Sequence, residues 1–153
     1  MTTEALLDTG RELIAPWTKE IAEPEARRLD AVIEAGDLLA AVEALHNAKW
    51  GYLSAITGLD QGVEAGIIEV LYHFCNEAAV LTLRVRVPRE APVVPSLYGL
   101  IQSVTFYERE LMEMLGVTVT GTPNSDRLFL PEDWPDGVYP LRKDFRMEQL
   151  HEA

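Results

Sequence analysis

The chain has 153 residues, of which 48% are hydrophobic and 25% are charged. This length and balance are typical of one folded domain with its own core, and they exclude a disordered chain. Acidic residues outnumber lysine and arginine by 25 to 13, which gives a formal net charge of −12. A chain this acidic should repel nucleic acid and anionic membrane surfaces, so neither is expected as a direct partner.

Cys75 is the single cysteine of the chain. One thiol excludes an intrachain disulfide, a four-thiolate iron–sulfur cluster and a cysteine-rich zinc site, and it fits a reducing compartment. The N-terminus lacks the pattern of a signal peptide, and no apolar run approaches the roughly 18 residues of a membrane span. We therefore expect any membrane attachment to go through another protein.

The N-terminal part of the chain predicts a helix, a surface connection, a strand and a second helix, over residues 3–14, 15–27, 28–34 and 37–48. Both helices have apolar residues at a spacing of three or four, and Thr3 and Asp37 are placed to cap them. The apolar residues of the strand alternate with its other residues, as in a strand with one buried face.

The middle of the chain predicts three strands and then a break, over residues 52–57, 67–74, 80–87 and 88–95. The second and third strands are rich in β-branched and aromatic residues and are separated by a few polar residues, which predicts a hairpin. Pro88, Pro92 and Pro95 are expected to exclude regular structure from the last stretch.

The C-terminal part predicts a helix, a short strand and an extended tail, over residues 105–115, 117–120 and 121–153. Thr105 and Glu108 have the spacing of a capping box, and Gly116 follows as a C-terminal stop. The tail has four prolines after Gly121 and is expected to lie across a surface, either its own or a partner's.

Together these elements predict an α+β fold, a two-layer sandwich in which a mixed, mostly antiparallel sheet carries helices on one face. A single domain is expected over residues 1–153. Its parts are an N-terminal helix and connection, an α+β core and the extended tail, over residues 1–27, 28–120 and 121–153.

The densest charge cluster lies on the helix at 105–115 and consists of Glu108, Arg109, Glu110 and Glu113. One interpretation is a solvated helix face with an Arg109–Glu113 pair, with Glu108 used in the capping box. The other is a stand-alone acid/base enzyme that uses Glu108 with Glu110 or Glu113. The sequence offers no nucleophile or metal-ligand set beside these carboxylates, so the first interpretation is favoured.

The second cluster is the tail from Arg127 to Phe145, which mixes aromatic residues with arginines. These residue types anchor protein–protein interfaces. From the residues alone, a tail folded over its own chain and a tail that binds a partner are equally good interpretations.

At these two clusters the chain resembles the thirty-kilodalton subunit of respiratory complex I, the proton-pumping NADH–quinone oxidoreductase. Three family runs have counterparts: E-R-E-x-x-D-[LM]-[FY]-G-[IV] at 108–117, G-H-P-D-L-R-R-x-L-L-P-E-D-W at 121–134, and H-P-L-R-K-D-F at 139–145. Segments 53–60, 69–73, 81–87 and 92–96 also match in order. The chain departs from the family pattern at Glu113, Leu115, Thr122, Asp126 and Arg146.

The resemblance implies a non-catalytic structural subunit without a cofactor, in the peripheral arm of the complex on the cytoplasmic side of the bacterial membrane. Its implied partners are the large quinone-site subunit and neighbouring iron–sulfur subunits, and it would meet the membrane only through them. The implied contact residues are Glu108, Arg109, Glu110, Glu113, Arg127, Pro131, Glu132, Asp133, Trp134, Tyr139, Pro140, Leu141, Arg142, Lys143, Asp144 and Phe145. No catalytic, cofactor-binding or metal-binding residue is implied.

The run from Trp134 to Tyr139 also resembles relatives in membrane-bound energy-converting hydrogenases and formate hydrogenlyase. The equivalent subunit of such a complex is therefore the alternative function.

Overall fold

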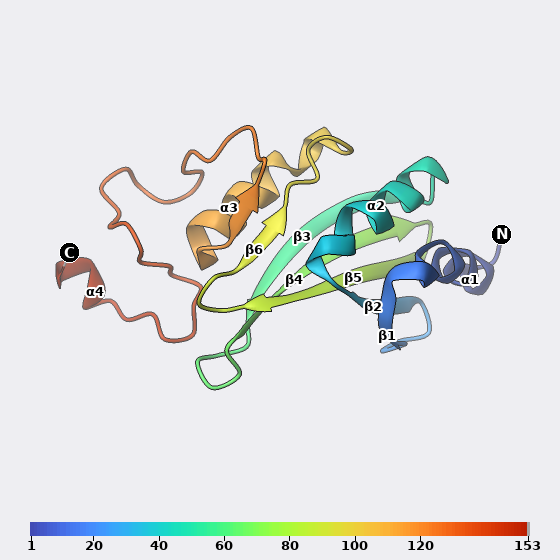
Figure 1. Ribbon diagram of the computed structural model, residues 1–153, viewed down its shortest axis with the longest axis horizontal. Helices are drawn as coiled ribbons and strands as arrows, with labels where there is room; N and C mark the ends of the chain where they lie inside the picture. The colour runs from blue at the N-terminus through green and yellow to red at the C-terminus, as the bar shows by residue number, and fades with distance from the viewer. Residues whose placement is uncertain (153) are drawn as a thin grey trace. The chain divides into compact units, whose positions relative to one another are not determined.

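The computed structural model describes residues 1–152 (Figure 1), and its internal contacts divide the chain into two compact units. The first unit comprises residues 1–57 and 70–86, and the second comprises residues 58–69 and the chain from Val87 onward. The predicted α+β class is confirmed, because helices accompany a mixed sheet. None of the helices within residues 1–152 is long and apolar enough to cross a bilayer.

Five strands form one sheet with the order β1-β2-β5-β4-β3, and most of their residues belong to the first unit. The strands are β1 (Thr18–Ala22), β2 (Arg28–Ile33), β3 (Tyr52–Asp60), β4 (Ile67–Asn76) and β5 (Ala79–Pro88). β1 pairs with β2 antiparallel, whereas β2 pairs with β5 parallel. A two-residue turn joins β4 to β5, as the hairpin prediction requires.

One face of this sheet is apolar because β2 and β5 pair in register. Their side chains form three adjacent pairs: Leu29–Leu81, Ala31–Leu83 and Ile33–Val85. All six are at most 2% exposed, so this face forms the core of the first unit.

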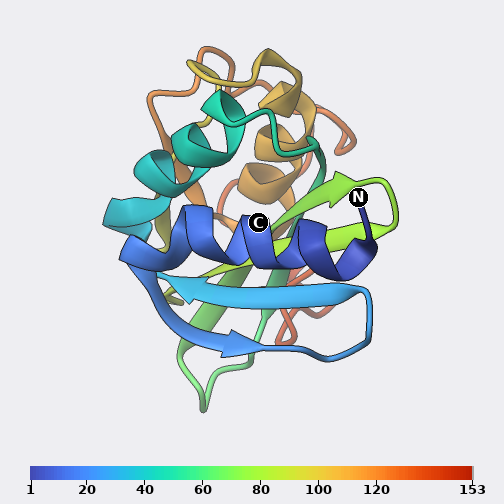
Figure 2. The same cartoon turned by 90° about the vertical axis from the view of Figure 1, so that its right-hand side faces the viewer.

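Two helices, α1 (Thr3–Ile14) and α2 (Leu38–Asn47), belong to the same unit, and Figure 2 shows α1 running alongside β2. Gly10 brings α1 close to the sheet, since a Cβ at this position would lie 2.8 Å from Leu81 Cδ1. The Trp50 indole donates a hydrogen bond to the Leu6 carbonyl at 2.8 Å. The apolar spacing read from the sequence therefore corresponds to a buried helix face.

The other face of the sheet carries polar side chains. Arg84 donates to the Asp30 carboxylate at 3.0 Å, and the His73 ring nitrogens lie 2.9 and 3.1 Å from the hydroxyls of Thr82 and Thr57. Burial and the neighbouring arginines lower the pKa of His73, although Asp30 acts in the opposite direction.

The second unit is built around α3 (Thr105–Leu115), which the 310-helix η3 (Gln102–Val104) precedes. β6 (Val93–Pro95) and β7 (Thr118–Thr120) pair parallel, with Val94 opposite Val119. Helix α4 (Gln149–Glu152) lies near the C-terminus. Between Gly121 and Glu148 the tail contains no helix or strand, as predicted.

Two predictions of irregular structure are wrong. The stretch 15–27 contains the 310-helix η1 (Ala15–Trp17) and then β1, whose side chains are mostly exposed. Such an edge strand forms through backbone hydrogen bonds and leaves no apolar alternation in the sequence. The prolines at 88–95 do not exclude β6, because a short edge strand tolerates the missing N–H of Pro95.

Two predicted caps are also wrong. Thr2, rather than Thr3, caps α1 by accepting the Ala5 N–H at 3.1 Å. Asp37 ends the 310-helix η2 (Ala35–Asp37) and makes no side-chain cap bond to α2, because η2 leads directly into this helix.

Candidate functional site

The candidate site lies in the second unit, where α3 holds the C-terminal tail. The helix buries Leu111 and Leu115 and ends at Gly116, which adopts φ +72°. This left-handed C-cap favours glycine, as the sequence predicted. Arg109 and Glu113 are four residues apart on α3, so they lie on the same face of the helix. Both contact the tail.

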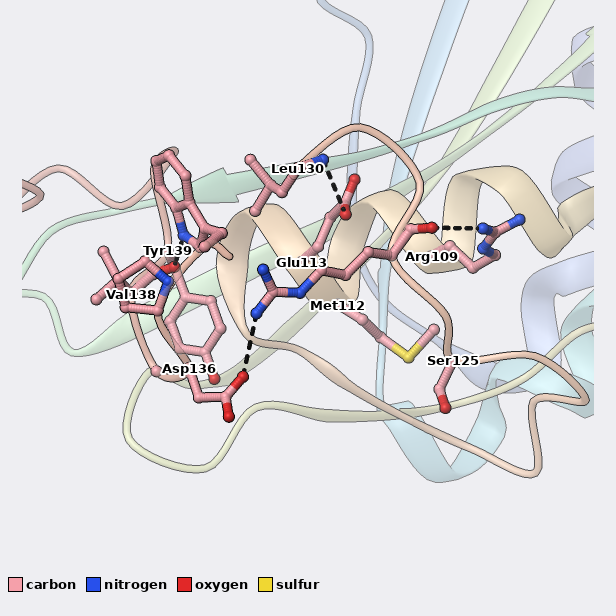
Figure 3. Close-up of a pocket in the computed structure, with 12 residues that line it drawn as sticks. Arg109, Met112, Glu113, Ser125, Leu130, Asp136, Val138 and Tyr139 are labelled. Atoms are coloured by element: carbon pink, nitrogen blue, oxygen red, sulfur yellow. Dashed lines mark hydrogen bonds and ion pairs between the residues drawn. The ribbon is translucent and has the colours of Figure 1, made fainter. Parts of the chain in front are cut away.

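Glu113 binds three consecutive main-chain N–H groups of the tail. Its carboxylate accepts those of Leu128, Phe129 and Leu130 at 2.9, 2.7 and 3.4 Å. Figure 3 shows Glu113 and Leu130 facing each other. A carboxylate that accepts several N–H groups makes charge-assisted hydrogen bonds, so Glu113 fixes the path of this segment.

Arg109 binds the same segment through carbonyl groups. Its Nε and Nη2 donate to the carbonyls of Asp126 and Arg127 at 2.8 and 2.7 Å. The expected Arg109–Glu113 pair is thus replaced by bonds from both side chains to the tail. Arg109 and Glu113 hold main-chain atoms of this segment, so the exposed side chain of Phe129 is left for other contacts.

A pocket of about 240 Å³ lies between α3 and the tail (Figure 3). Residues that line it include Met112, Glu113, Leu130, Trp134, Val138 and Tyr139. The Trp134 indole donates to the Val138 carbonyl at 2.8 Å. Arg127 donates to the Pro131 carbonyl at 2.7 Å and pairs with Asp136 at 3.1 Å, so the loop that forms the wall is closed by its own hydrogen bonds.

The tail makes a further contact at the end of α3. Arg142 donates to the Leu115 carbonyl at 2.8 Å and lies over the Tyr139 ring at 4.9 Å. A Cβ on Gly116 would lie 2.4 Å from the Tyr139 ring. Glycine therefore serves both the helix end and the close approach of this ring.

A buried ion pair fixes the last part of the tail. Asp60 is 2% exposed and accepts from Arg89 Nε and Nη2 at 2.9 and 3.0 Å. Arg89 also donates to Asp144 at 2.6 Å, and the Lys143 N–H donates to Asp60 at 2.8 Å. The Arg89 guanidinium, helped by the N–H groups of Lys143 and Gly62, holds the pKa of Asp60 well below its usual range despite burial.

Sequence reasoning missed Arg89 as part of this site. Asp60 stands out in the sequence only as the end of a matching strand, and Arg89 lies within a proline-rich stretch. Their pairing joins residues far apart in the chain, and no local spacing indicates it.

Glu108 is not part of a capping box. It is 1% exposed and accepts from the Ser96 hydroxyl at 2.6 Å and from the Leu97 N–H at 2.9 Å, whereas Thr105 donates to the Gln102 carbonyl. Burial raises the pKa of Glu108, and these two hydrogen bonds oppose that rise. The carboxylate instead ties α3 to the segment that follows β6.

The structure does not bring the three glutamates together as an acid/base site. Glu113 lines the pocket, but its oxygens are occupied by N–H groups, and neither Glu108 nor Glu110 lines it. Within residues 1–152, no three His, Cys, Asp or Glu side chains are grouped to hold a metal ion.

The other expected contact residues lie on the tail with different exposures. Trp134 and Phe145 stack with ring centroids 6.1 Å apart. Tyr139, Pro140 and Arg142 are half-buried. The exposed ones are Pro131, Glu132, Asp133, Leu141, Lys143 and Asp144. Phe129 was not among the expected residues, yet it is 64% exposed beside them in sequence.

Comparisons with known proteins agree with the motifs. Residues 31–150 match the family described as respiratory-chain NADH dehydrogenase, 30 Kd subunit. Formate hydrogenlyase subunit 5 of Escherichia coli (strain K12) is 35% identical over 120 residues, which are 76% of this chain and 21% of that protein. NAD(P)H-quinone oxidoreductase subunit J of Synechococcus sp. (strain WH7803) is 33% identical over 145 residues, which are 87% of this chain and 78% of that protein.

A solved structure shares the fold. A chain in the membrane-bound sulfane sulfur reductase, described as an archaeal respiratory membrane complex, superposes with a TM-score of 0.79 at 22% identity. The match covers 97% of this chain and 88% of the other. By contrast, this chain spans about a fifth of the formate hydrogenlyase subunit, where the matching stretch is one part of a much longer polypeptide.

Proposed function

The chain belongs to the family of the respiratory-chain NADH dehydrogenase 30 Kd subunit, as the motifs predicted, and from that premise we propose that it is a structural subunit of such a complex. In this proposal it has no catalytic role and carries no cofactor, and it positions a neighbour in the peripheral arm of the proton-pumping NADH–quinone oxidoreductase. Family membership implies partner subunits in the same assembly. The finer proposal names the large quinone-site subunit and the iron–sulfur subunits beside it.

The observation that carries the proposal is a tail that is held firmly by its main chain and still exposes apolar side chains. Glu113 and Arg109 hold residues 126–130, while Phe129 and Leu141 are 64% and 56% exposed. Exposed apolar residues on an ordered segment are typical of a protein–protein interface. The tail would therefore be preformed for a partner.

This proposal also covers localisation. We place the chain peripherally, on the cytoplasmic side of the bacterial membrane, where its partners would provide the attachment. The acidic charge of −12 supports an indirect attachment, because an anionic lipid surface would repel it.

A specific observation favours one alternative, the equivalent subunit of a membrane-bound hydrogenase or formate hydrogenlyase-type complex. The 35% identity with formate hydrogenlyase subunit 5 and the tail run from Trp134 to Tyr139 support it. The physical role is the same in both assemblies, and only the identity of the neighbours differs. The stand-alone enzyme has no such support, because Glu108 is buried and bonded within the chain.

The test is affinity purification of the tagged chain from solubilised membranes of the native host, with partners identified by mass spectrometry. Recovery of the quinone-site subunit with flavin and iron–sulfur subunits supports the complex I assignment. Recovery with a nickel-site hydrogenase subunit supports the alternative. A chain recovered alone would overturn both.

A matched pair of variants adds a control to this test. Arg142→Ala with Asp144→Ala removes two tail contacts within the second unit, those to the Leu115 carbonyl and to Arg89. Arg11→Ala with Glu23→Ala removes a surface ion pair of the first unit. We expect the first double variant to fold but to recover fewer partner subunits, and the second to behave like the wild type.

A further inference from the structure

We propose that Asp136 and Gly137 form a site of spontaneous isoaspartate formation, where the main chain of the tail rearranges with water as the only co-reactant. Asp136–Gly137 is the single Asp-Gly pair of the sequence. The chemistry belongs to the chain alone, so it does not depend on the proposed function. Three features carry it: the exposed carboxyl group, the free N–H of the glycine and the space around that nitrogen.

The reaction is a cyclisation followed by a hydrolysis. The Gly137 main-chain nitrogen attacks Cγ of the Asp136 carboxyl group. A C–N bond forms, the nitrogen gives up its proton and one water molecule leaves, which produces a five-membered succinimide ring. Water then breaks the bond between the nitrogen and the main-chain carbonyl carbon of Asp136. The chain now runs through Cγ, which is isoaspartate, and its mass is unchanged.

The Asp136 side chain is free to reach the geometry of attack. It is fully exposed, and it pairs at 3.1 Å with Arg127, whose side chain is itself 30% exposed. A surface ion pair of this kind contributes little to stability and opens readily. The surrounding tail contains no helix or strand, so no regular hydrogen-bonding pattern holds the main chain at this point.

The Gly137 nitrogen is also free. Within residues 1–152 its N–H donates no hydrogen bond, so it can turn toward the carboxyl group without breaking one. Gly137 adopts φ +77°, and nothing lies within 4 Å of the place that a Cβ would occupy. The glycine therefore leaves both conformational freedom and space around the attacking atom.

Asp133 lies in the same loop and provides an internal comparison. It is exposed, as Asp136 is, but the nitrogen that follows it belongs to Trp134. That N–H donates to the Pro131 carbonyl at 3.0 Å, and the indole donates to the Val138 carbonyl at 2.8 Å. The nitrogen after Asp133 is thus held in place, so exposure of the carboxyl group is not sufficient there.

Conversion would change the loop that forms the wall of the pocket. Isoaspartate adds one carbon to the main chain between Trp134 and Val138, whose hydrogen bond closes the loop. It also shortens the side chain that pairs with Arg127. The contacts of the loop would have to rearrange, so the site makes this part of the tail sensitive to the age of the protein.

The test uses the full chain, incubated at 37 °C and pH 7.4 in water enriched in oxygen-18 and sampled over six weeks. Digestion in ordinary water and electron-transfer fragmentation then locate isoaspartate by its diagnostic fragments. We expect about tenfold more isoaspartate at position 136 than at position 133, because the rate depends on how freely the reacting groups meet. The product should carry oxygen-18, because hydrolysis of the ring adds an oxygen atom from the solvent. Equal amounts at both positions, no isoaspartate at 136, or a product without the label would overturn the inference.

Asp136→Glu is the matched variant. It keeps the charge at this exposed position, but its cyclisation would give a six-membered ring, which forms far more slowly. We expect almost no isomer at position 136 in this variant. A yield equal to that of the wild type would show that the five-membered ring is not the route.

A parallel incubation in 6 M guanidinium chloride measures what the fold contributes. Asp136 should react in the folded chain at a rate within about threefold of its unfolded rate, because the loop already leaves both groups free. Asp133 should react faster once unfolding releases the Trp134 N–H. A larger slowing of Asp136 by the fold would mean that the loop protects it, and the inference would fail.

Discussion

Arg89 donates two parallel hydrogen bonds to the Asp60 carboxylate, from Nε to Oδ1 and from Nη2 to Oδ2. The carboxylate is almost fully buried, and the same guanidinium extends to Asp144 of the tail. The pair therefore serves two purposes, since it neutralises a buried charge and fastens the last part of the tail within the second unit.

Removal of Arg89 should be costly. In Arg89→Ala the Asp60 carboxylate stays buried without its cation, and we expect the free energy of unfolding to fall by about 3 kcal/mol. Arg89→Lys should lose less stability than Arg89→Ala, because its ammonium still supplies a positive charge. It should still be less stable than the wild type, because an ammonium cannot make the bidentate contact. Urea denaturation measures both, and Arg146→Ala, an exposed arginine of the same tail, should change stability by less than about 0.5 kcal/mol. Equal losses in all three variants would contradict this account.

The same pair predicts a pH dependence. Asp60 has a pKa that is lowered on folding, chiefly by Arg89, so its contribution is present above the pKa of about 3.9 of an unfolded aspartate. That contribution is lost progressively as the pH falls below about 4. Stability measured from pH 7 down to pH 2.5 should therefore drop more steeply in the wild type than in Asp60→Asn. Parallel curves would show that Asp60 is not the group responsible.

Glu108 should affect the pH dependence of stability in the opposite direction to Asp60. Burial raises its pKa on folding, so the protonated form is the better accommodated and the charged form costs stability as the pH rises above about 4.3. Glu108→Gln keeps an acceptor for the Leu97 N–H and a donor for Ser96 Oγ. We expect this variant to gain stability relative to the wild type between pH 4.5 and pH 8, as followed by urea denaturation at each pH. A difference that does not change with pH would show that the charge of Glu108 carries no such cost.

Glu113 and Glu110 form a matched pair on α3 for testing the hold on the tail. Glu113→Ala leaves three main-chain N–H groups without their carboxylate, whereas Glu110 makes no hydrogen bond to the tail within residues 1–152. We expect trypsin to cleave after Arg127 about tenfold faster in Glu113→Ala, because cleavage follows local opening of the segment. Glu110→Ala should be cut at the wild-type rate, and faster cutting in both would indicate a general loosening of the helix.

A comparison of Gly116→Ala with Gly121→Ala distinguishes the cost of a positive φ from the cost of a clash with the Tyr139 ring. Both have positive φ, but a Cβ at Gly116 would meet the Tyr139 ring, whereas nothing lies within 4 Å of a Cβ at Gly121. Both alanine variants should lose about 1 kcal/mol for the backbone conformation, and Gly116→Ala should lose more because of the clash. In a Tyr139→Ala background this extra loss should disappear, which a double-mutant cycle measures. Equal losses at the two glycines would mean that the Tyr139 ring moves aside at no cost.

The elements that could be predicted from the sequence are those whose signal is local. The alternation from Leu81 to Val87 marks a strand because every second side chain is buried in the core. The bounds of α3 and its stop at Gly116 follow from apolar spacing and from the left-handed cap. A local pattern is sufficient in both cases because the neighbours that decide the structure are within one turn or one strand.

The remaining features depend on partners that are distant in the chain. β1 joins the sheet through its backbone, so its exposed side chains show no pattern. Glu108 fits the spacing of a capping box, but Ser96 and Leu97 lie close enough in space to compete for its carboxylate. The tail motifs identified the candidate site, whereas the pocket and the Asp60–Arg89 pair needed three-dimensional contacts.

The parallel pairing of β2 with β5 has a consequence for the order in which the sheet can assemble. Ile33 pairs with Val85, so β2 cannot gain its inner neighbour until the chain that contains β3 and β4 has been made. Until β5 has been synthesised, the edge of β2 that pairs with it stays unpaired. The antiparallel β1–β2 pair is only marginally stable alone. We expect the β2–β5 contacts, which join distant parts of the chain, to form late in the folding of the first unit.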